Sequence, residues 1–272
     1  MWVLGNTLHQ HDLKKTPTST HVTDHIPADV RRELRQEVNY GCAKCGAPII
    51  DYHHIIPKNE YEHNNPEHMV ALCPNHHRPS DDEAIERTEL YQLKKNPHNE
   101  SKVDHLFHFS SKKPEFRLAK LNCIIDEEAT HPLLTVGEET LFSVSHGNNL
   151  LSFDMKIHDR NGELMAKITH NEWQAYTDQI WDLRYKSNEL SLWDPNEELR
   201  LRLNFNPEDN LIEFQAKFYK NNESFKILPS KITASQSGTI KGDGEIYFGV
   251  PEGTSLFHVN DTMGDLKLGY DM

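Results

Sequence analysis

The stretch CAKCGAPIIDYHHIIPKNEYEHNNPEHMVALCPNHH, residues 42–77, decides how the first part of the chain folds. It starts with a Cys-x2-Cys pair, Cys42 and Cys45, and has a Cys-x2-His pair, Cys73 and His76, near its end. The members of each pair can reach one ion, and two such pairs complete a closed tetrahedral shell. The spacing therefore predicts a structural zinc site, which would stabilise a subdomain too small to be held by its core alone.

The composition of the whole chain bounds its class. With 272 residues, 36% of them apolar, the sequence fits a soluble globular protein of two domains. Three of the four cysteines fall between Cys42 and Cys73, which favours metal binding over a disulfide framework. No apolar run approaches the roughly 18 residues of a membrane span, and the N-terminus shows no signal-peptide pattern. We therefore expect a cytoplasmic protein with no membrane partner.

The net charge of −13 is distributed unevenly along the chain. Residues 1–113 carry 14 Lys+Arg against 16 Asp+Glu, a net −2, so residues 114–272 carry 15 against 26, a net −11. Histidine shows the opposite distribution, with 13 of 18 in the first part. Because an acidic surface repels phosphates, we expect the second part to serve regulation, self-association or recognition of another protein.

Shifts in composition divide the chain into four segments. We expect a flexible arm over residues 1–27, a small domain over residues 28–97, a linker over residues 98–114 and an acidic β-rich domain over residues 115–272. In the small domain, Val30, Leu34 and Val38 recur every four residues, which predicts a short amphipathic helix. Further helices are expected near Pro74 and over residues 86–96, after a hairpin, so the fold class is α+β.

The second part consists of short alternating runs separated by turn signals. This pattern is typical of an all-β domain, either an antiparallel sandwich or a stacked β-solenoid. Asn161-Gly162, within IHDRNGELMAKI, predicts a hairpin with a two-residue turn. Cys123, in an apolar run, is expected to be a buried thiol. Three tryptophans would either form a recognition surface or pack in the core and at strand ends: Trp173, Trp181 and Trp193.

The motifs CAKCG, DYHHIIP and EHMVALCPNHHR, in this order and spacing, resemble the HNH endonuclease family over about residues 28–97. The resemblance implies a ββα-metal nuclease domain. By position, His54 matches the general base that deprotonates the attacking water. His53 and His77 match ligands of the catalytic divalent metal. Adjacent strand residues face opposite sides, so His53 and His54 can share one site only if the strand ends or bends there.

His68 departs from the family pattern, because the family has an asparagine there that braces the loop carrying the base. A neutral imidazole can donate one hydrogen bond and accept another, so His68 could keep the bracing role. Asn64 or Asn65 could also take it over. Asp51, on the same strand face as His53, would be either an outer-shell orienter of the metal ligand or a solvated carboxylate.

The chemistry of phosphodiester hydrolysis fits these residues. It needs an activated water and neutralisation of charge on the phosphoryl oxygens. An imidazole with an ordinary pKa near ~6.5 is mostly free base at neutral pH. On a helix, consecutive residues are about 100° apart, so His76 can face the structural zinc while His77 faces the catalytic metal. We expect Mg²⁺ there by default, although imidazole also suits Mn²⁺, Ni²⁺ or Zn²⁺.

Grip on nucleic acid would come from basic residues around this module. The sequence offers no separate helix for reading bases, so we expect DNA binding of low sequence specificity, with double-stranded DNA as the partner. The candidate contacts are Arg31, Arg32, Arg35, Lys58, Arg78, Lys94 and Lys95.

These features together predict a metal-dependent HNH endonuclease of bacterial or phage-related origin that hydrolyses DNA. Its activity would be controlled by a partner or by homo-oligomerisation through the β-rich domain, as in an effector of antiviral defence. One alternative is a non-catalytic zinc knuckle that binds nucleic acid or protein. Another is the same core used as a nickase, a restriction enzyme or an RNase.

Overall fold

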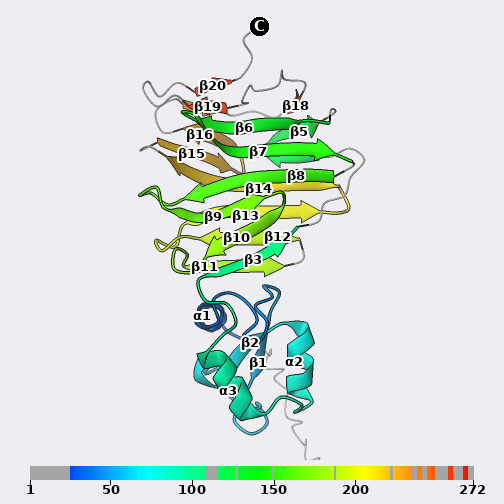
Figure 1. Ribbon diagram of the computed structural model, residues 1–272, viewed down its shortest axis with the longest axis vertical. Coiled ribbons are helices and arrows are strands. Elements are labelled where there is room, and N and C mark those ends of the chain that lie inside the picture. Colours follow the sequence, from blue (N-terminus) through cyan, green and yellow to red (C-terminus); the bar gives the residue numbers. More distant parts are fainter. Residues whose placement is uncertain are drawn as a thin grey trace, which may run out of the picture.

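The computed structural model describes residues 25–107, 115–125, 128–148, 150–186, 188–220, 223–234, 238–240, 244–248, 257–259 and 266–268. Most of the predicted arm (residues 1–24) and the second half of the predicted linker (residues 108–114) lie outside this set. A small lobe with three helices sits at one end of a large β structure (Figure 1). No helix among the described residues has the length and apolarity that crossing a membrane requires.

The small lobe has its helices and hairpin where the sequence predicts them. Its elements are α1 (Ala28–Glu37), β1 (Asp51–His54), the 3-10 turn η1 (Pro66–His68), β2 (Met69–Leu72), α2 (Pro74–Asp81) and α3 (Arg87–Lys95). Strands β1 and β2 pair antiparallel with His53 opposite Val70 and His54 opposite Met69. Strand β2 is buried along its whole length, and α1 buries Leu34 completely. The core of this lobe is small.

The second part is a two-sheet β structure with a common apolar core. Among the described residues, one sheet has the order β20-β19-β6-β7-β8-β9-β10-β3, and the other runs from β11 through β17 with β4, β5 and β18 attached. The strands are β3 (Lys102–Leu106), β4 (Glu115–Leu118), β5 (Leu121–Ile125), β6 (Thr130–Val136), β7 (Glu139–Gly147), β8 (Leu150–His158), β9 (Leu164–Thr169), β10 (Glu172–Tyr176), β11 (Asp182–Lys186), β12 (Glu189–Trp193), β13 (Leu199–Asn206), β14 (Leu211–Lys220), β15 (Glu223–Leu228), β16 (Lys231–Ala234), β17 (Gly238–Ile240), β18 (Gly244–Phe248), β19 (Phe257–Val259) and β20 (Leu266–Leu268).

Aromatic side chains from the two sheets meet in this core. Phe153 on β8 lies 4.9 Å from Phe214 on β14, and Phe142 on β7 lies 5.2 Å from the same ring, measured between centroids. Because the sheets face each other across these rings, the architecture is a sandwich, the first of the two predicted alternatives. Cys123 is buried in it, as expected, and Trp173 is buried as well, which is the core-packing alternative for that residue. Burial raises the pKa of the Cys123 thiol to about 12.

The predicted hairpin at residues 159–163 is present, but its turn is longer than two residues. Strand β8 ends at His158 and β9 begins at Leu164. The Asp159 carboxylate accepts hydrogen bonds from the backbone N–H groups of Asn161 and Glu163, both at 2.8 Å. Gly162 adopts a φ of 90°. The side chain of Asp159 therefore organises a five-residue loop, which the Asn-Gly signal alone does not reveal.

The predicted linker over residues 98–114 needs a correction for residues 102–106. These residues form β3, which pairs antiparallel with β10 at the edge of one sheet of the sandwich. Val103 is buried in the sandwich core, whereas the other side chains of β3 are exposed. A single buried position in a polar strand leaves little apolar signal, so the sequence pattern resembles a linker.

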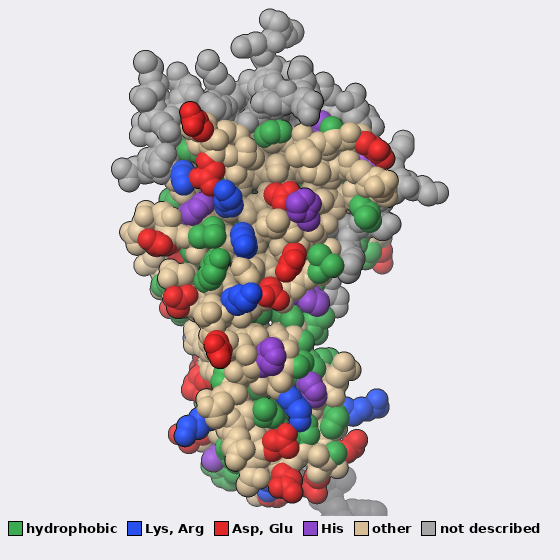
Figure 2. All heavy atoms as spheres, viewed as in Figure 1, with side chains coloured by type: hydrophobic (Ala, Val, Ile, Leu, Met, Phe, Trp, Pro, Cys, Tyr) green, Lys and Arg blue, Asp and Glu red, His purple; other side chains and the backbone are tan. Residues whose placement is uncertain are grey.

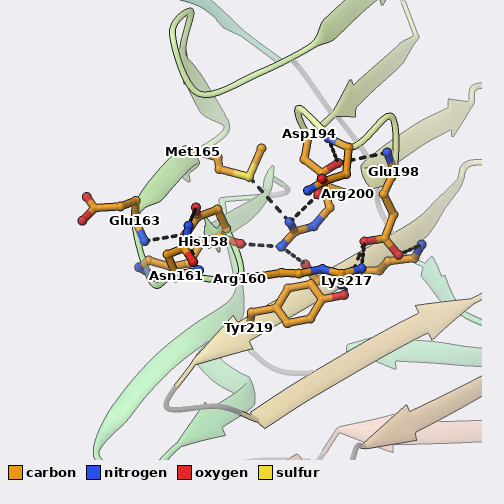
Figure 3. A network of polar contacts seen from close by, with 12 residues as sticks. His158, Arg160, Asn161, Glu163, Met165, Asp194, Glu198, Arg200, Lys217 and Tyr219 are labelled. Atoms are coloured by element: carbon orange, nitrogen blue, oxygen red, sulfur yellow. Dashed lines mark hydrogen bonds and ion pairs between the residues drawn. The ribbon is translucent and has the colours of Figure 1, made fainter.

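A buried arginine ties the two sheets together at one side of the sandwich (Figure 3). Arg200 on β13 is 0% exposed and donates to Asp194 at 3.0 Å and to the backbone carbonyl of His158 at the end of β8. Its guanidinium lies 4.3 Å from the ring centroid of Tyr219 on β14. Beside it, Glu198 accepts from Lys217 at 2.8 Å and from Arg160. One charged network thus spans β8, β13 and β14.

The lobe is joined to the sandwich by a buried ion pair. Arg35 of α1 donates to both carboxylate oxygens of Asp182 on β11, at 2.8 and 2.7 Å, and also to the hydroxyl of Tyr52 on β1. Arg35 is 6% exposed and Asp182 is 0% exposed. Burial alone would lower the pKa of Arg35, but the hydrogen bonds and charges of Asp182 and Tyr52 together outweigh it and the pKa is raised. The guanidinium therefore stays charged at the junction.

Other contacts at the junction involve the chain just before β11. The Arg32 guanidinium lies 4.3 Å from the ring centroid of Trp181, and Gln36 donates to the Trp181 carbonyl at 2.6 Å. The Tyr40 hydroxyl donates to the carbonyl of Ile180 at 3.0 Å, and its ring belongs to the sandwich core. Tyr40 is thus packed in the sandwich core, whereas Val38 and Cys42 on either side of it belong to the core of the lobe.

We expect Asp182→Ala to destabilise the protein by about 3–5 kcal/mol, because it leaves the Arg35 guanidinium buried without its counter-charge. Chemical denaturation of the full chain measures this. Asp104→Ala is the matched control, since Asp104 forms an exposed pair with Lys102 at 3.7 Å and should cost less than about 1 kcal/mol. Equal, small losses in both variants would contradict a structural role for the buried pair.

Candidate metal centres and pocket

The first candidate centre is formed by the four residues predicted from the sequence. Cys42 and Cys45 lie on a tight turn, where the N–H of Gly46 donates to the carbonyl of Cys42 at 2.8 Å. Gly46 has a φ of 76°, a conformation that favours glycine. Cys73 precedes the first turn of α2, and the N–H of His76 donates to its carbonyl at 2.9 Å. The turn and the helix start thus bring both pairs together.

The donor atoms of these four residues fit a tetrahedral ion. They lie within 4.8 Å of one another. The Nδ1 atom of His76 is 3.5 Å from the sulfur of Cys42 and 3.3 Å from that of Cys73, and the sulfurs of Cys45 and Cys73 are 3.7 Å apart. Ideal zinc–ligand lengths give edges of about 3.6 Å for S···N and about 3.8 Å for S···S. The cluster could therefore hold a metal ion.

The second candidate centre contains one residue that the sequence reasoning missed. His53, His77 and Asp81 offer donor atoms that lie within 4.8 Å of one another. One oxygen of Asp81 is 3.1 Å from Nδ1 of His53, and the other is 2.9 Å from Nδ1 of His77. Asp81 follows His77 by four residues on α2, so the two share a helix face. The four-residue spacing between His77 and Asp81 is the sequence signal that could have identified Asp81.

The doublet His53-His54 lies at the end of β1, where the regular strand stops, so both residues can line one pocket. Burial, followed by the nearby His77, lowers the pKa of His53. Burial and then the charge of Lys58 lower the pKa of His54, although hydrogen bonds to Asn64 and the His63 backbone act in the opposite direction. A lowered pKa favours the free base at neutral pH, which is the form that accepts a proton.

His63, which the sequence reasoning passed over, organises the loop beside His54. Its Nε2 donates to the carbonyl of Ile56 at 2.9 Å, and its Nδ1 accepts from the N–H of Asn65 at 3.1 Å. These two bonds connect the two ends of the loop. The ring of His63 also lies 5.2 Å from the ring of His54, at an interplanar angle of 74°. His63 therefore fixes both the loop and one side of the candidate base.

The side chain of His68 points to a different partner. Its Nδ1 lies 2.9 Å from the hydroxyl of Tyr91 on α3, and its ring lies 5.9 Å from that of His63. Its backbone carbonyl accepts from the N–H of Ile55, just after β1, at 2.8 Å. Of the two asparagines considered as substitutes, Asn65 caps the η1 turn by accepting from the N–H of Glu67. Asn64, the other one, hydrogen-bonds the side chain of His54, while His63 connects the ends of the loop.

An open pocket of about 910 Å³ connects the second centre with His54. Besides the histidines, its charged lining residues are Asp51, Lys58, Asp81, Glu83, Glu86 and Arg87. Carboxylates outnumber cations in this set. Arg87 also pairs with Glu60, which reduces the positive charge that it offers to a ligand. A polyanion bound here would depend on metal ions or on interactions other than charge.

The seven basic residues expected to grip nucleic acid divide into groups. Arg35 is a correction to the predicted patch, since its guanidinium is buried in the pair with Asp182. Arg32 packs on the sandwich, and Lys94 pairs with Glu37. Lys58 lines the pocket. The other three have partly or fully exposed side chains on the lobe: Arg31, Arg78 and Lys95.

The comparisons with known proteins leave the site to be judged by its geometry alone. No protein-family model matches the chain, and neither the search of curated proteins nor the search of solved structures finds a match.

We expect Cys45→Ala to abolish metal retention by the four-residue cluster and to unfold the small lobe, because a small core cannot replace the ion. Elemental analysis measures the metal, and hydrogen exchange over residues 28–97 measures the lobe. Cys123→Ala removes a buried thiol outside the cluster and should leave the bound metal unchanged. Full metal content with normal lobe protection in Cys45→Ala would show that this residue is not a ligand.

Proposed function

We propose that the chain is a metal-dependent endonuclease of the HNH type that hydrolyses DNA phosphodiester bonds. The observation that carries this proposal is the convergence of His53, His77 and Asp81 beside His54 in one open pocket. A non-catalytic zinc knuckle would need only the Cys42, Cys45, Cys73 and His76 cluster. It offers no reason for a second donor set with an uncharged imidazole next to it.

The first metal cluster serves structure in this proposal. Zn²⁺ suits three sulfurs and one imidazole, and the four donors leave no open position for a substrate. Zn²⁺ binds thiolates, so its binding must displace protons from the thiols. The ion would fix the start of α2 and with it the position of His77.

The second donor set suits a catalytic divalent metal. Two imidazoles favour Mn²⁺, Ni²⁺ or Zn²⁺ over Mg²⁺, whereas the carboxylate of Asp81 accepts any of them. A metal held by His53, His77 and Asp81 would supply positive charge to the phosphoryl group. The Asp81 carboxylate contacts Nδ1 of both imidazoles, and these contacts keep the three donors close together.

His54 is the proposed general base. Its lowered pKa keeps the imidazole neutral at neutral pH, so it can take the proton of the attacking water. His63 positions the His54 side chain through a backbone hydrogen bond and the ring contact. A base held in one position reaches the reactive geometry at a lower entropic cost. We further propose that the sandwich, through oligomerisation or a protein partner, controls when this activity is released.

We expect His54→Ala and Asp81→Ala to lower DNA cleavage at least about 100-fold, the usual size of a general-base or ligand contribution. Plasmid nicking in Mn²⁺ and in Mg²⁺ measures this, with DNA and RNA as parallel substrates. Asp82→Ala is the matched control, because Asp82 is the exposed neighbour of Asp81 outside the pocket and its loss should leave cleavage intact. Unchanged cleavage in His54→Ala, with fold and zinc retained, would sink the mechanism.

We expect His63→Phe to lower kcat by roughly 10- to 100-fold with little change in KM, because it keeps a ring against His54 but removes both hydrogen bonds of the loop. His63→Gln retains one donor and one acceptor and should recover part of the loss. Steady-state kinetics on an oligonucleotide separates the two constants. A drop confined to KM, or no rescue by glutamine, would rule out the positioning role.

A further inference from the structure

The loop between β1 and η1 presents an aromatic ring to solvent. Tyr61 is 60% exposed, more than any other large apolar side chain among the described residues. It lies five residues before η1, in the same loop as Lys58, which lines the pocket. A single exposed tyrosine is ordinary on a protein surface, so its surroundings decide whether the ring can serve a ligand.

The ring of Tyr61 is mounted on an ordered support. It stacks on His63 at 5.3 Å between centroids, with an interplanar angle of 22°. The loop itself is held in two further ways. The N–H groups of Glu60 and Tyr61 donate to the Pro57 carbonyl at 2.9 and 3.2 Å, and the Glu60 carboxylate pairs with Arg87 of α3. One face of the tyrosine ring is thus covered while much of the ring stays open to solvent.

The stack leads directly to the candidate base. The ring of His63 contacts both the ring of Tyr61 and the ring of His54, whose centroid lies 5.2 Å away. Two ring contacts therefore separate the exposed ring from the residue proposed to activate water. A flat group lying on Tyr61 would be placed beside the pocket, near the position of the reacting phosphate.

The charges around the pocket favour stacking over ionic attraction. Arg35 and Arg32 are engaged at the junction, and Arg87 and Lys94 pair with glutamates of the lobe. Three other cations of the lobe, with partly or fully exposed side chains, lie outside the pocket lining: Arg31, Arg78 and Lys95. The pocket lining contains more carboxylates than cations. Continuous duplex DNA is held mainly through its phosphates, which this surface attracts weakly. An aromatic platform binds a base through its π-face, independently of charge.

We propose that Tyr61 is a base-stacking platform and that the pocket acts on nucleic acid with an unpaired nucleotide beside the scissile phosphate. Bases inside a continuous duplex are covered on both faces by their neighbours, so they have no face to offer. A single strand, an overhang or a flap does. This inference rests on the proposed nuclease function and departs from the expected preference for double-stranded DNA.

The test is binding of a labelled single strand and its matched duplex to the full chain, by fluorescence anisotropy without added divalent metal, so that no cleavage interferes. Wild type should bind the single strand more tightly than the duplex. Tyr61→Ala should lose about tenfold in affinity for the single strand and little for the duplex. Tyr61→Phe keeps the ring and should bind normally, whereas Tyr61→Leu keeps bulk alone and should resemble alanine.

Two controls make the result specific. Ile49→Ala removes another exposed apolar side chain of the lobe, at 37% exposure and outside the pocket, and should leave binding unchanged. A single-stranded RNA of the same sequence shows whether DNA or RNA supplies the unpaired base. Circular dichroism and zinc content must match wild type in every variant, so that a misfolded lobe is not mistaken for a lost platform.

The outcomes separate this proposal from the proposed function. Equal loss for single strand and duplex, no loss in Tyr61→Ala, or tighter binding of duplex by wild type would overturn the platform. Cleavage in Mn²⁺ that is normal in Tyr61→Ala would also overturn it while leaving the nuclease intact. Strand-selective binding that depends on Tyr61, without any cleavage by wild type, would instead remove the nuclease and leave a nucleic-acid-binding site.

Discussion

Four side chains from two segments of the small lobe lie together and could hold a metal ion: Cys42 and Cys45 with Cys73 and His76. The buried core of this lobe is small, and small domains are often stabilised by a structural metal. An ion bound by the four donors would add to the stability of the lobe. The same cluster fixes the first turn of α2. His77 and Asp81 lie on the helix that begins with that turn, so the geometry of the second donor set depends on that of the first.

The sequence predicted the parts of the lobe that local spacing encodes. The four donors lie together as the two short motifs require, and the hairpin and helices follow the expected order. His53 and His77 meet as expected, because a strand end and a helix start were both visible in the pattern. Asp81 and His63 were missed for different reasons. Asp81 lies one helical turn beyond the motif, and His63 acts through backbone groups, whose positions no residue pattern reveals.

Long-range contacts account for the remaining errors. Arg35 looked like a surface cation beside two other arginines, yet its partner Asp182 lies 147 positions away. The strand β3 looked like a linker because its pairing partner β10 is also remote in sequence, with Lys102 opposite Tyr176. The net charge of the second part was also a coarse guide to the charges on its surface. Figure 2 shows acidic and basic side chains interspersed over the face of the sandwich, rather than one continuous acidic surface.

The buried junction makes the small lobe and the sandwich structurally dependent on each other. A nuclease lobe restrained by a separate regulatory domain could be freed by cutting between them, but here that cut would leave Arg35 without its counter-charge and expose Tyr40. The sandwich is therefore part of what folds the lobe. Arg35 also donates to Tyr52, the residue before His53 on β1. A shift of β11 would reach the candidate metal ligands through these two side chains, which gives any control by the sandwich a short physical route.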